Sequence, residues 1–151
     1  MKGEVKVKNE IFLKKIKEEY KETVVIVQIG AFCHVYGNDA YIISNLCGYQ
    51  IKSVENSYNT CGFAKSAYEK VAKVLEENEI NYIQIIKSKE YEIGKSKTYK
   101  KNKYTEIYKK AYKQQTIKNR VNEIYNFLIE NINDAEIKNK IQKIENVLFE
   151  E

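Results

Sequence analysis

The segment Thr23–Ile29 constrains the fold more than any other part of the chain. Its sequence, TVVIVQI, is almost entirely β-branched, and Gly30 follows it directly. A short run of this composition that ends at glycine predicts a β-strand. Phe32–Tyr36, which ends at Gly37, predicts a second strand, so two adjacent strands are expected to meet at Gly30.

Helical and strand-like segments alternate on either side of this pair. Apolar residues recur at helical spacing from Glu10 to Lys21, and Asn9 is a suitable N-cap for that helix. The further predictions are helices at Ala40–Cys47 and Ser66–Glu79, strands at Tyr49–Val54 and Tyr82–Ile86, and a strand or loop at Tyr58–Gly62. This order predicts an α/β domain of the α+β type over residues 1–87, with a small mixed β-sheet flanked by helices.

The rest of the chain differs in character. Residues 88–103 are polar and basic and are expected to form a connector, and residues 104–151 a C-terminal helical extension. Its predicted helices are Tyr104–Gln115, Ile117–Ile132 and Ala135–Phe149, and the last two carry apolar stripes at helical spacing. The break between those two helices is short enough for an antiparallel helical hairpin. Either the α/β domain or a second copy of the chain could cover the stripes, so a homodimer through the C-terminal helices is one expectation.

Size and composition exclude several classes of protein. The chain has 151 residues, which fits one domain of ordinary size or a small domain with an extension. Thr23–Ile29 is its longest apolar stretch, far shorter than a membrane span, and no secretory signal follows Met1, so a cytoplasmic protein without a membrane partner is expected. Its three cysteines, at positions 33, 47 and 61, lack the close pairing of metal or redox motifs and are expected to be reduced.

Positive charge is concentrated in one region of the chain. Residues 87–120 contain twelve Lys and Arg residues against three acidic ones, a net charge of +9, and tyrosines are interleaved with them. Cations that hold phosphates beside rings that stack on bases are typical of nucleic-acid surfaces. The alternative is a solvated, flexible connector in a lysine-rich protein.

Motifs for catalysis and cofactor binding are absent from the sequence. It contains neither a phosphate-binding G-x-x-x-x-G-K-[ST] loop nor a G-x-G-x-x-G fingerprint, so no cofactor is expected. A single His and a single Arg leave few groups for acid-base chemistry, and the acidic residues suggest no metal site. Adjacent strand residues point to opposite faces, so Cys33 and His34 are not expected to form a nucleophile pair. The sequence therefore favours a non-enzymatic protein.

Two segments resemble the N-terminal mismatch-recognition domain of the MutS family of DNA repair proteins. They are Val27–Ala40, with the sequence VQIGAFCHVYGNDA, and the stretch from Cys61-Gly62-Phe63 through the following helix to Asn81–Ile85. The resemblance covers about residues 9–87. It implies a small mixed sheet flanked by helices, and it leaves out the connector, lever, clamp and ATPase domains of that family.

The resemblance also implies a DNA-contacting site. In that family a Phe wedges beside a mispaired base from the minor groove and a Glu two residues later hydrogen-bonds to the base; Phe32 matches the Phe, and His34 stands in place of the Glu. Phe32 and His34 lie two apart in a predicted strand and therefore share a face. Without the resemblance, Phe32 is more simply explained as a buried aromatic residue that packs on the sheet.

Two hypotheses from different classes follow. In the first, the chain is a DNA-binding module whose partner is double-stranded DNA, matched or mismatched: Phe32 inserts at a deformed base step, His34 hydrogen-bonds there, and lysines contact phosphates, namely Lys95, Lys97, Lys100, Lys101 and Lys103. In the second, it is a protein-interaction or dimerisation module that keeps the fold without mismatch recognition.

Overall fold

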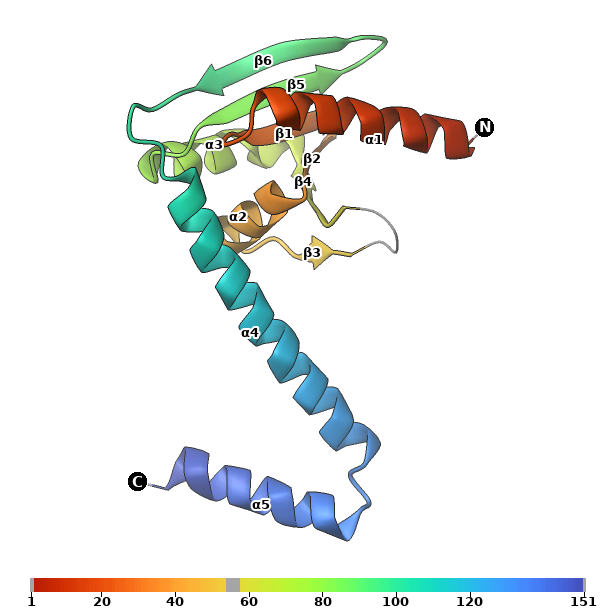
Figure 1. Ribbon diagram of the computed structural model, residues 1–151, viewed down its shortest axis with the longest axis vertical. Coiled ribbons are helices and arrows are strands. Elements are labelled where there is room, and N and C mark those ends of the chain that lie inside the picture. Colours follow the sequence, from red (N-terminus) through yellow and green to blue (C-terminus); the bar gives the residue numbers. More distant parts are fainter. Residues whose placement is uncertain (1, 54–57, 151) are drawn as a thin grey trace. The chain divides into compact units, whose positions relative to one another are not determined.

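A computed structural model describes residues 2–53 and 58–150 (Figure 1). The chain divides into two compact units, residues 1–112 and residues 113–151. The elements are α1 Lys2–Glu19, β1 Val24–Ile29, β2 Phe32–Tyr36, α2 Asn38–Cys47, β3 Ile51–Lys52, β4 Thr60–Ala64, the 3₁₀ turn η1 Lys65–Ala67, α3 Tyr68–Glu77, β5 Tyr82–Lys87, β6 Tyr91–Lys97, α4 Tyr104–Glu130 and α5 Ala135–Phe149.

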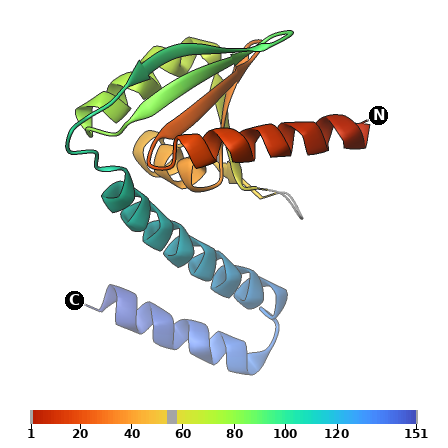
Figure 2. The same cartoon turned by 45° about the horizontal axis from the view of Figure 1, so that its top comes forward.

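The first unit is built around one mixed sheet of six strands in the order β3-β4-β2-β1-β5-β6. β1 and β5 run parallel, and all the other neighbouring strands pair antiparallel. α1 packs on one face of the sheet, and α2 and α3 pack on the other (Figures 1 and 2). The expectation of a small mixed sheet flanked by helices, of the α+β type, is confirmed.

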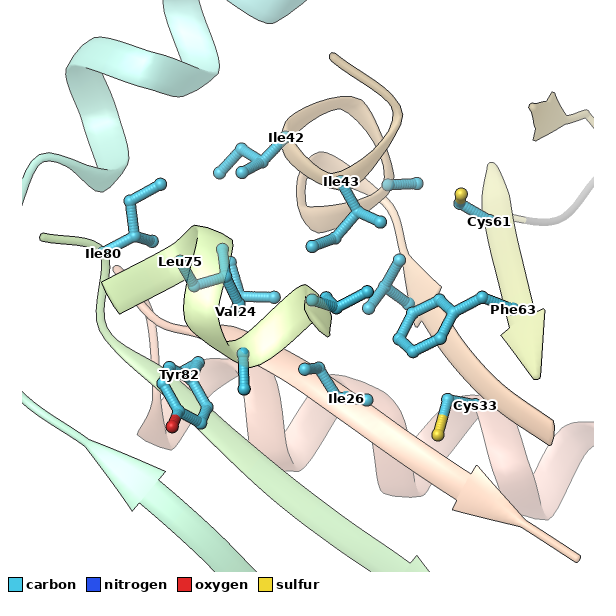
Figure 3. Close-up of a cluster of buried hydrophobic side chains, with 14 of the residues drawn as sticks. Val24, Ile26, Cys33, Ile42, Ile43, Cys61, Phe63, Leu75, Ile80 and Tyr82 are labelled. Carbon is cyan, nitrogen blue, oxygen red and sulfur yellow. The ribbon is translucent and has the colours of Figure 1, made fainter. Parts of the chain in front are cut away.

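The larger core lies between the sheet and helices α2 and α3 (Figure 3). Alternate residues of β1, Val24 and Ile26, contact this core, while Val25 and Val27 face α1 on the other side. All four side chains are buried, because helices cover both faces of β1. Burying each such side chain contributes about 1.5–3 kcal/mol, which explains why the strand is apolar at consecutive positions rather than at every second one.

Several predicted elements have different boundaries in the structure. The first helix begins earlier than Glu10, and the two helices predicted on either side of Thr116 form the single helix α4, since neither Gly nor Pro interrupts them. α5 has the predicted bounds, and Asp134 caps it by accepting hydrogen bonds from the backbone N–H groups of residues 136 and 137. The strand predicted at Tyr49–Val54 is limited to β3 among the described residues, and Val54 lies outside them.

The first unit extends beyond the predicted boundary at residue 87. The segment 88–103, expected to be a basic connector, contains the edge strand β6, and the unit continues to residue 112. β6 is held mainly by its backbone pairing with β5, and most of its side chains are exposed. An exposed edge strand needs few apolar residues, so its composition does not distinguish it from a loop. The side chains of Asn81 and Asn102 fix the segment that follows, because they accept hydrogen bonds from the backbone N–H groups of Tyr99 and Asn81 respectively.

The three cysteines are free thiols, as expected, and Cys33 and Cys61 are buried. Burial raises the pKa of the Cys61 thiol to about 11. No helix in the described part of the chain is long and apolar enough to cross a membrane.

Candidate nucleic-acid interface

A tight hairpin turn presents the aromatic residue that the resemblance singles out. Ile29 of β1 pairs with Phe32 of β2, which leaves only Gly30 and Ala31 in the turn. Gly30 has a φ of 58°, and Ala31 is not among the residues with positive φ. This combination is the II′ hairpin turn, in which glycine is favoured at the first central position. The turn makes Phe32 the first residue of β2, at the end of the sheet.

The Phe32 ring is exposed. Its side chain is 58% accessible, whereas Cys33 and Val35, its neighbours on the opposite face, are fully buried in the main core. The interpretation of Phe32 as a buried aromatic residue that packs on the sheet is therefore wrong. An apolar ring held at a rigid hairpin can contact a partner without unfolding any part of the domain.

Strand pairing places Phe32 in a row of residues that crosses the sheet on the α1 face. The register connects Ala64, Phe32, Ile29, Lys87 and Tyr91, in that order, from β4 to β6. We call these five residues the wedge row. The Lys87 ammonium lies 5.5 Å from the centroid of the Tyr91 ring. An exposed phenyl ring, a lysine and a tyrosine thus share one end and one face of the sheet.

His34 lies one row further along β2, on the same face as Phe32. It pairs with Gly62 of β4, and a Cβ added to Gly62 would lie 3.3 Å from the imidazole Nδ1, so the glycine leaves room for the ring. Burial, and after it the charge of Lys52, lower the pKa of His34. The imidazole is therefore neutral at pH 7 and can donate one hydrogen bond and accept another. Cys33 points into the core on the other face, which confirms that it does not pair with His34.

The structure does not bring the five predicted lysines together with Phe32. Lys97 pairs with Tyr82 at the start of β5, whereas Lys87, in the wedge row, ends that strand. Five residues of strand separate the two ends by about 17 Å. Lys100, Lys101 and Lys103 follow Lys97 in the chain towards α4 and so lie at its end of the sheet.

Two of these lysines already have partners within the fold. Lys95 forms an ion pair with Glu69 of α3, on the face opposite to Phe32. Lys103 forms an ion pair with Glu79 at 2.5 Å. Both pairs are exposed to solvent, so their contribution to stability is small.

Other lysines, which the sequence analysis did not single out, lie at the same end of the sheet as Phe32. Lys87 belongs to the wedge row, and the backbone N–H of Lys65 donates to the Ala31 carbonyl at 2.8 Å. Lys89 lies in the turn between β5 and β6, which is at this end because β1 and β5 run parallel. The parallel pairing of β1 with β5 is what places these lysines beside Phe32. The composition of the basic segment gives no information about that pairing.

The fold and the residues at this end of the sheet together define a class of protein. It is a small α+β domain that presents an exposed aromatic residue at a hairpin, with lysines at the same end of its sheet. Residues 9–126 match the family model described as MutS domain I. The chain therefore belongs to the MutS domain I family, the family of mismatch-recognition domains. The match includes β6 and most of α4, beyond the residues that carry the sequence resemblance. A comparison with curated proteins finds no match.

Proposed function

We propose that the chain is a non-enzymatic protein that binds double-stranded DNA and prefers mismatched or deformed base steps. The observation that carries this proposal is the exposure of Phe32, 58% accessible, at the hairpin of a MutS domain I fold. An exposed aromatic ring at the end of the sheet is suited to insertion between bases. Membership of a mismatch-recognition family supports DNA as the partner of that ring.

The preference for deformed steps follows from the energy of insertion. A side chain that wedges between bases must offset unstacking, which costs a few kcal/mol and costs least where the base pair is already weak. His34 lies beside Phe32 on the same face and, as a neutral imidazole, can hydrogen-bond to a donor or an acceptor on the displaced base. Phe32 therefore supplies the wedge and His34 the polar contact.

Lysines at two ends of the sheet supply phosphate contacts. Lys65, Lys87 and Lys89 lie near the wedge. The set predicted from sequence, apart from Lys95 and Lys97 on the opposite face, lies about 17 Å away along the strands. Since bases in a duplex are spaced 3.4 Å apart, that distance corresponds to about five base pairs. Lys100, Lys101 and Lys103 would thus contact the same duplex away from the deformed step, whereas Lys97 pairs with Tyr82 and so points to the opposite face of the sheet.

Fluorescence anisotropy with matched and mismatched duplexes over a series of salt concentrations tests this proposal. We expect binding to weaken steeply with salt, because each neutralised phosphate releases counterions, with a slope of about −0.9 per contact. Replacing Lys87 with glutamine should lower the slope by about one unit, and Lys73→Gln, a change on the exposed surface of α3, should leave it unchanged. Failure to bind either duplex at low salt would refute the proposal.

The environment of His34 predicts a pH dependence of DNA binding. Because burial lowers the pKa of His34, its imidazole is neutral above the ordinary value of about 6.5 and gains a proton only below it. A protonated ring next to phosphates strengthens binding, so affinity should be constant from about pH 8 to pH 6.5 and rise below that. His34→Gln, which cannot titrate, should abolish the rise. Equal pH profiles for the two proteins would show that His34 does not face the DNA.

A second candidate function rests on the C-terminal unit. In the described part of residues 113–150, Ile137 is the one buried apolar side chain, while the stripe Ile117, Val121, Ile124 of α4 is exposed, as are Ile144 and Leu148 of α5. Such faces are typical of helices that pack against partners, so we also propose a dimerisation or protein-interaction module. Light scattering separates the two functions: a stable dimer that binds no duplex at low salt would favour this second one.

A further inference from the structure

A hollow lies on the α1 face of the sheet. It has a volume of about 360 Å³, within the range of about 300–1,000 Å³ that small-molecule sites occupy. Its walls come from α1, from Val25 of β1 and from the junction between β2 and α2, and Tyr58 completes it. We call this hollow the α1 pocket.

The walls of the α1 pocket suit a flat, apolar ring. Leu13 and Val25 contribute aliphatic side chains, and Tyr36 and Tyr58 contribute aromatic rings. Tyr36 is partly buried, whereas Tyr58 is 45% exposed. Aromatic rings of this kind stack on any nucleobase, because every base has a π-face.

The charged side chains of the pocket favour an anion. Lys17 already has partners within the fold, since its ammonium donates to the Asp39 carboxylate and to the Thr23 carbonyl, both at 2.6 Å. Lys14 of α1 and Lys21, in the turn that follows α1, are exposed and line the pocket together with the acidic side chain of Glu18. Two lysines against one glutamate leave an excess of positive charge where a ligand would enter.

The α1 pocket lies on the same face of β2 as the candidate DNA site. Phe32, His34 and Tyr36 occupy alternate positions of β2 and so point to the same face. The rings of His34 and Tyr36 have centroids 6.3 Å apart, and Phe32 and Tyr36 are separated by about 13 Å of strand. A row of three rings therefore leads from the hairpin turn to the pocket.

We propose that the α1 pocket binds one nucleoside phosphate, with its base against Tyr36 and Tyr58 and its phosphate at Lys14 and Lys21. For one source of this ligand the inference rests on the proposed function: an unpaired nucleotide that leaves the duplex beside Phe32 and crosses His34. The other source is a free nucleoside monophosphate, which presents the same base and phosphate.

The test compares the two sources with the full-length chain. A duplex with one unpaired 2-aminopurine nucleotide and its fully paired counterpart are titrated by anisotropy and fluorescence, and free nucleoside monophosphates are titrated by calorimetry. The variant Lys14→Glu/Lys21→Glu reverses the charge of the two exposed lysines of the pocket. Lys15→Glu/Lys70→Glu is the matched control, since it makes the same change in charge at exposed positions outside the pocket.

We expect stacking in the pocket to quench 2-aminopurine in the wild-type complex. The pocket variant should lower the affinity ratio of unpaired to paired duplex by about tenfold and relieve the quenching, while the control leaves both unchanged. Tyr36→Leu should weaken the quenching as well. Binding of a free monophosphate that the pocket variant loses would also support the site, with the free ligand as its source.

The inference is overturned if no monophosphate binds and the pocket variant behaves like its control with both duplexes. This result differs from failure of the proposed function. Loss of all duplex binding would refute the DNA-binding role, and the calorimetric titration would still decide whether the pocket takes a nucleoside phosphate.

Discussion

Replacing Phe32 with alanine is expected to lower the affinity for a mismatched duplex by about 10- to 100-fold, because a ring stacked on a base contributes about 1–3 kcal/mol. The affinity for the matched duplex should fall less, since insertion there must also break intact stacking. The fold should be unaffected, because the ring is exposed and lies outside both apolar cores. Anisotropy titrations of both duplexes at one low salt concentration measure the effect.

Two further variants make this result specific to the ring at the hairpin. Phe32→Tyr keeps an aromatic ring and should retain most of the preference for the mismatch. Ile11→Ala removes an exposed apolar side chain of α1 that belongs neither to the wedge row nor to the α1 pocket, and it should bind as the wild-type protein does. If Phe32→Ala binds both duplexes with unchanged affinity, the wedge role is excluded whatever the lysines contribute.

Local sequence patterns were sufficient to predict the central part of the fold. The β-branched run of β1 and the glycine at position 30 locate the β1–β2 hairpin, because residue preference and turn geometry act over a few neighbouring residues. The edge strand β6 could not be found in this way. It is a strand because β5 offers it backbone partners, which is a property of the tertiary structure and not of its own polar residues.

The candidate site also has one part that local sequence predicts and one part that depends on the tertiary structure. That Phe32 and His34 share a face follows from the two-residue period of a strand and needs no other part of the chain. Which lysines lie near Phe32 depends instead on the parallel pairing of β1 with β5, two strands separated by more than fifty residues. The density of lysine along the sequence therefore pointed to Lys97–Lys103, at the far end of the sheet, and passed over Lys87.

A buried carboxylate gives the largest expected effect on stability. Asp39, at the start of α2, is 1% exposed and accepts three kinds of hydrogen bond: from the Lys17 ammonium and the Tyr104 hydroxyl at 2.6 Å each, and from the Val25 backbone N–H at 3.0 Å. These contacts join α1, β1 and α2 to the first residue of α4. Burial raises the pKa of the Asp39 carboxyl, so desolvation of the charge opposes the stabilising contacts.

Asp39→Ala should lower the free energy of unfolding by about 3–5 kcal/mol, since removing the buried acceptor leaves its hydrogen-bond donors without that partner. The Tyr104 hydroxyl and the Val25 N–H would remain buried without an acceptor, whereas Lys17 can turn towards solvent. Asp39→Asn keeps one acceptor oxygen for the Lys17 and Tyr104 donors, loses the acceptor of the Val25 N–H, and removes the charge that burial disfavours, so it should cost less than alanine. Urea unfolding followed by circular dichroism measures both variants. Equal losses for asparagine and alanine would show that one retained acceptor oxygen, facing Lys17 and Tyr104, does not stabilise this junction.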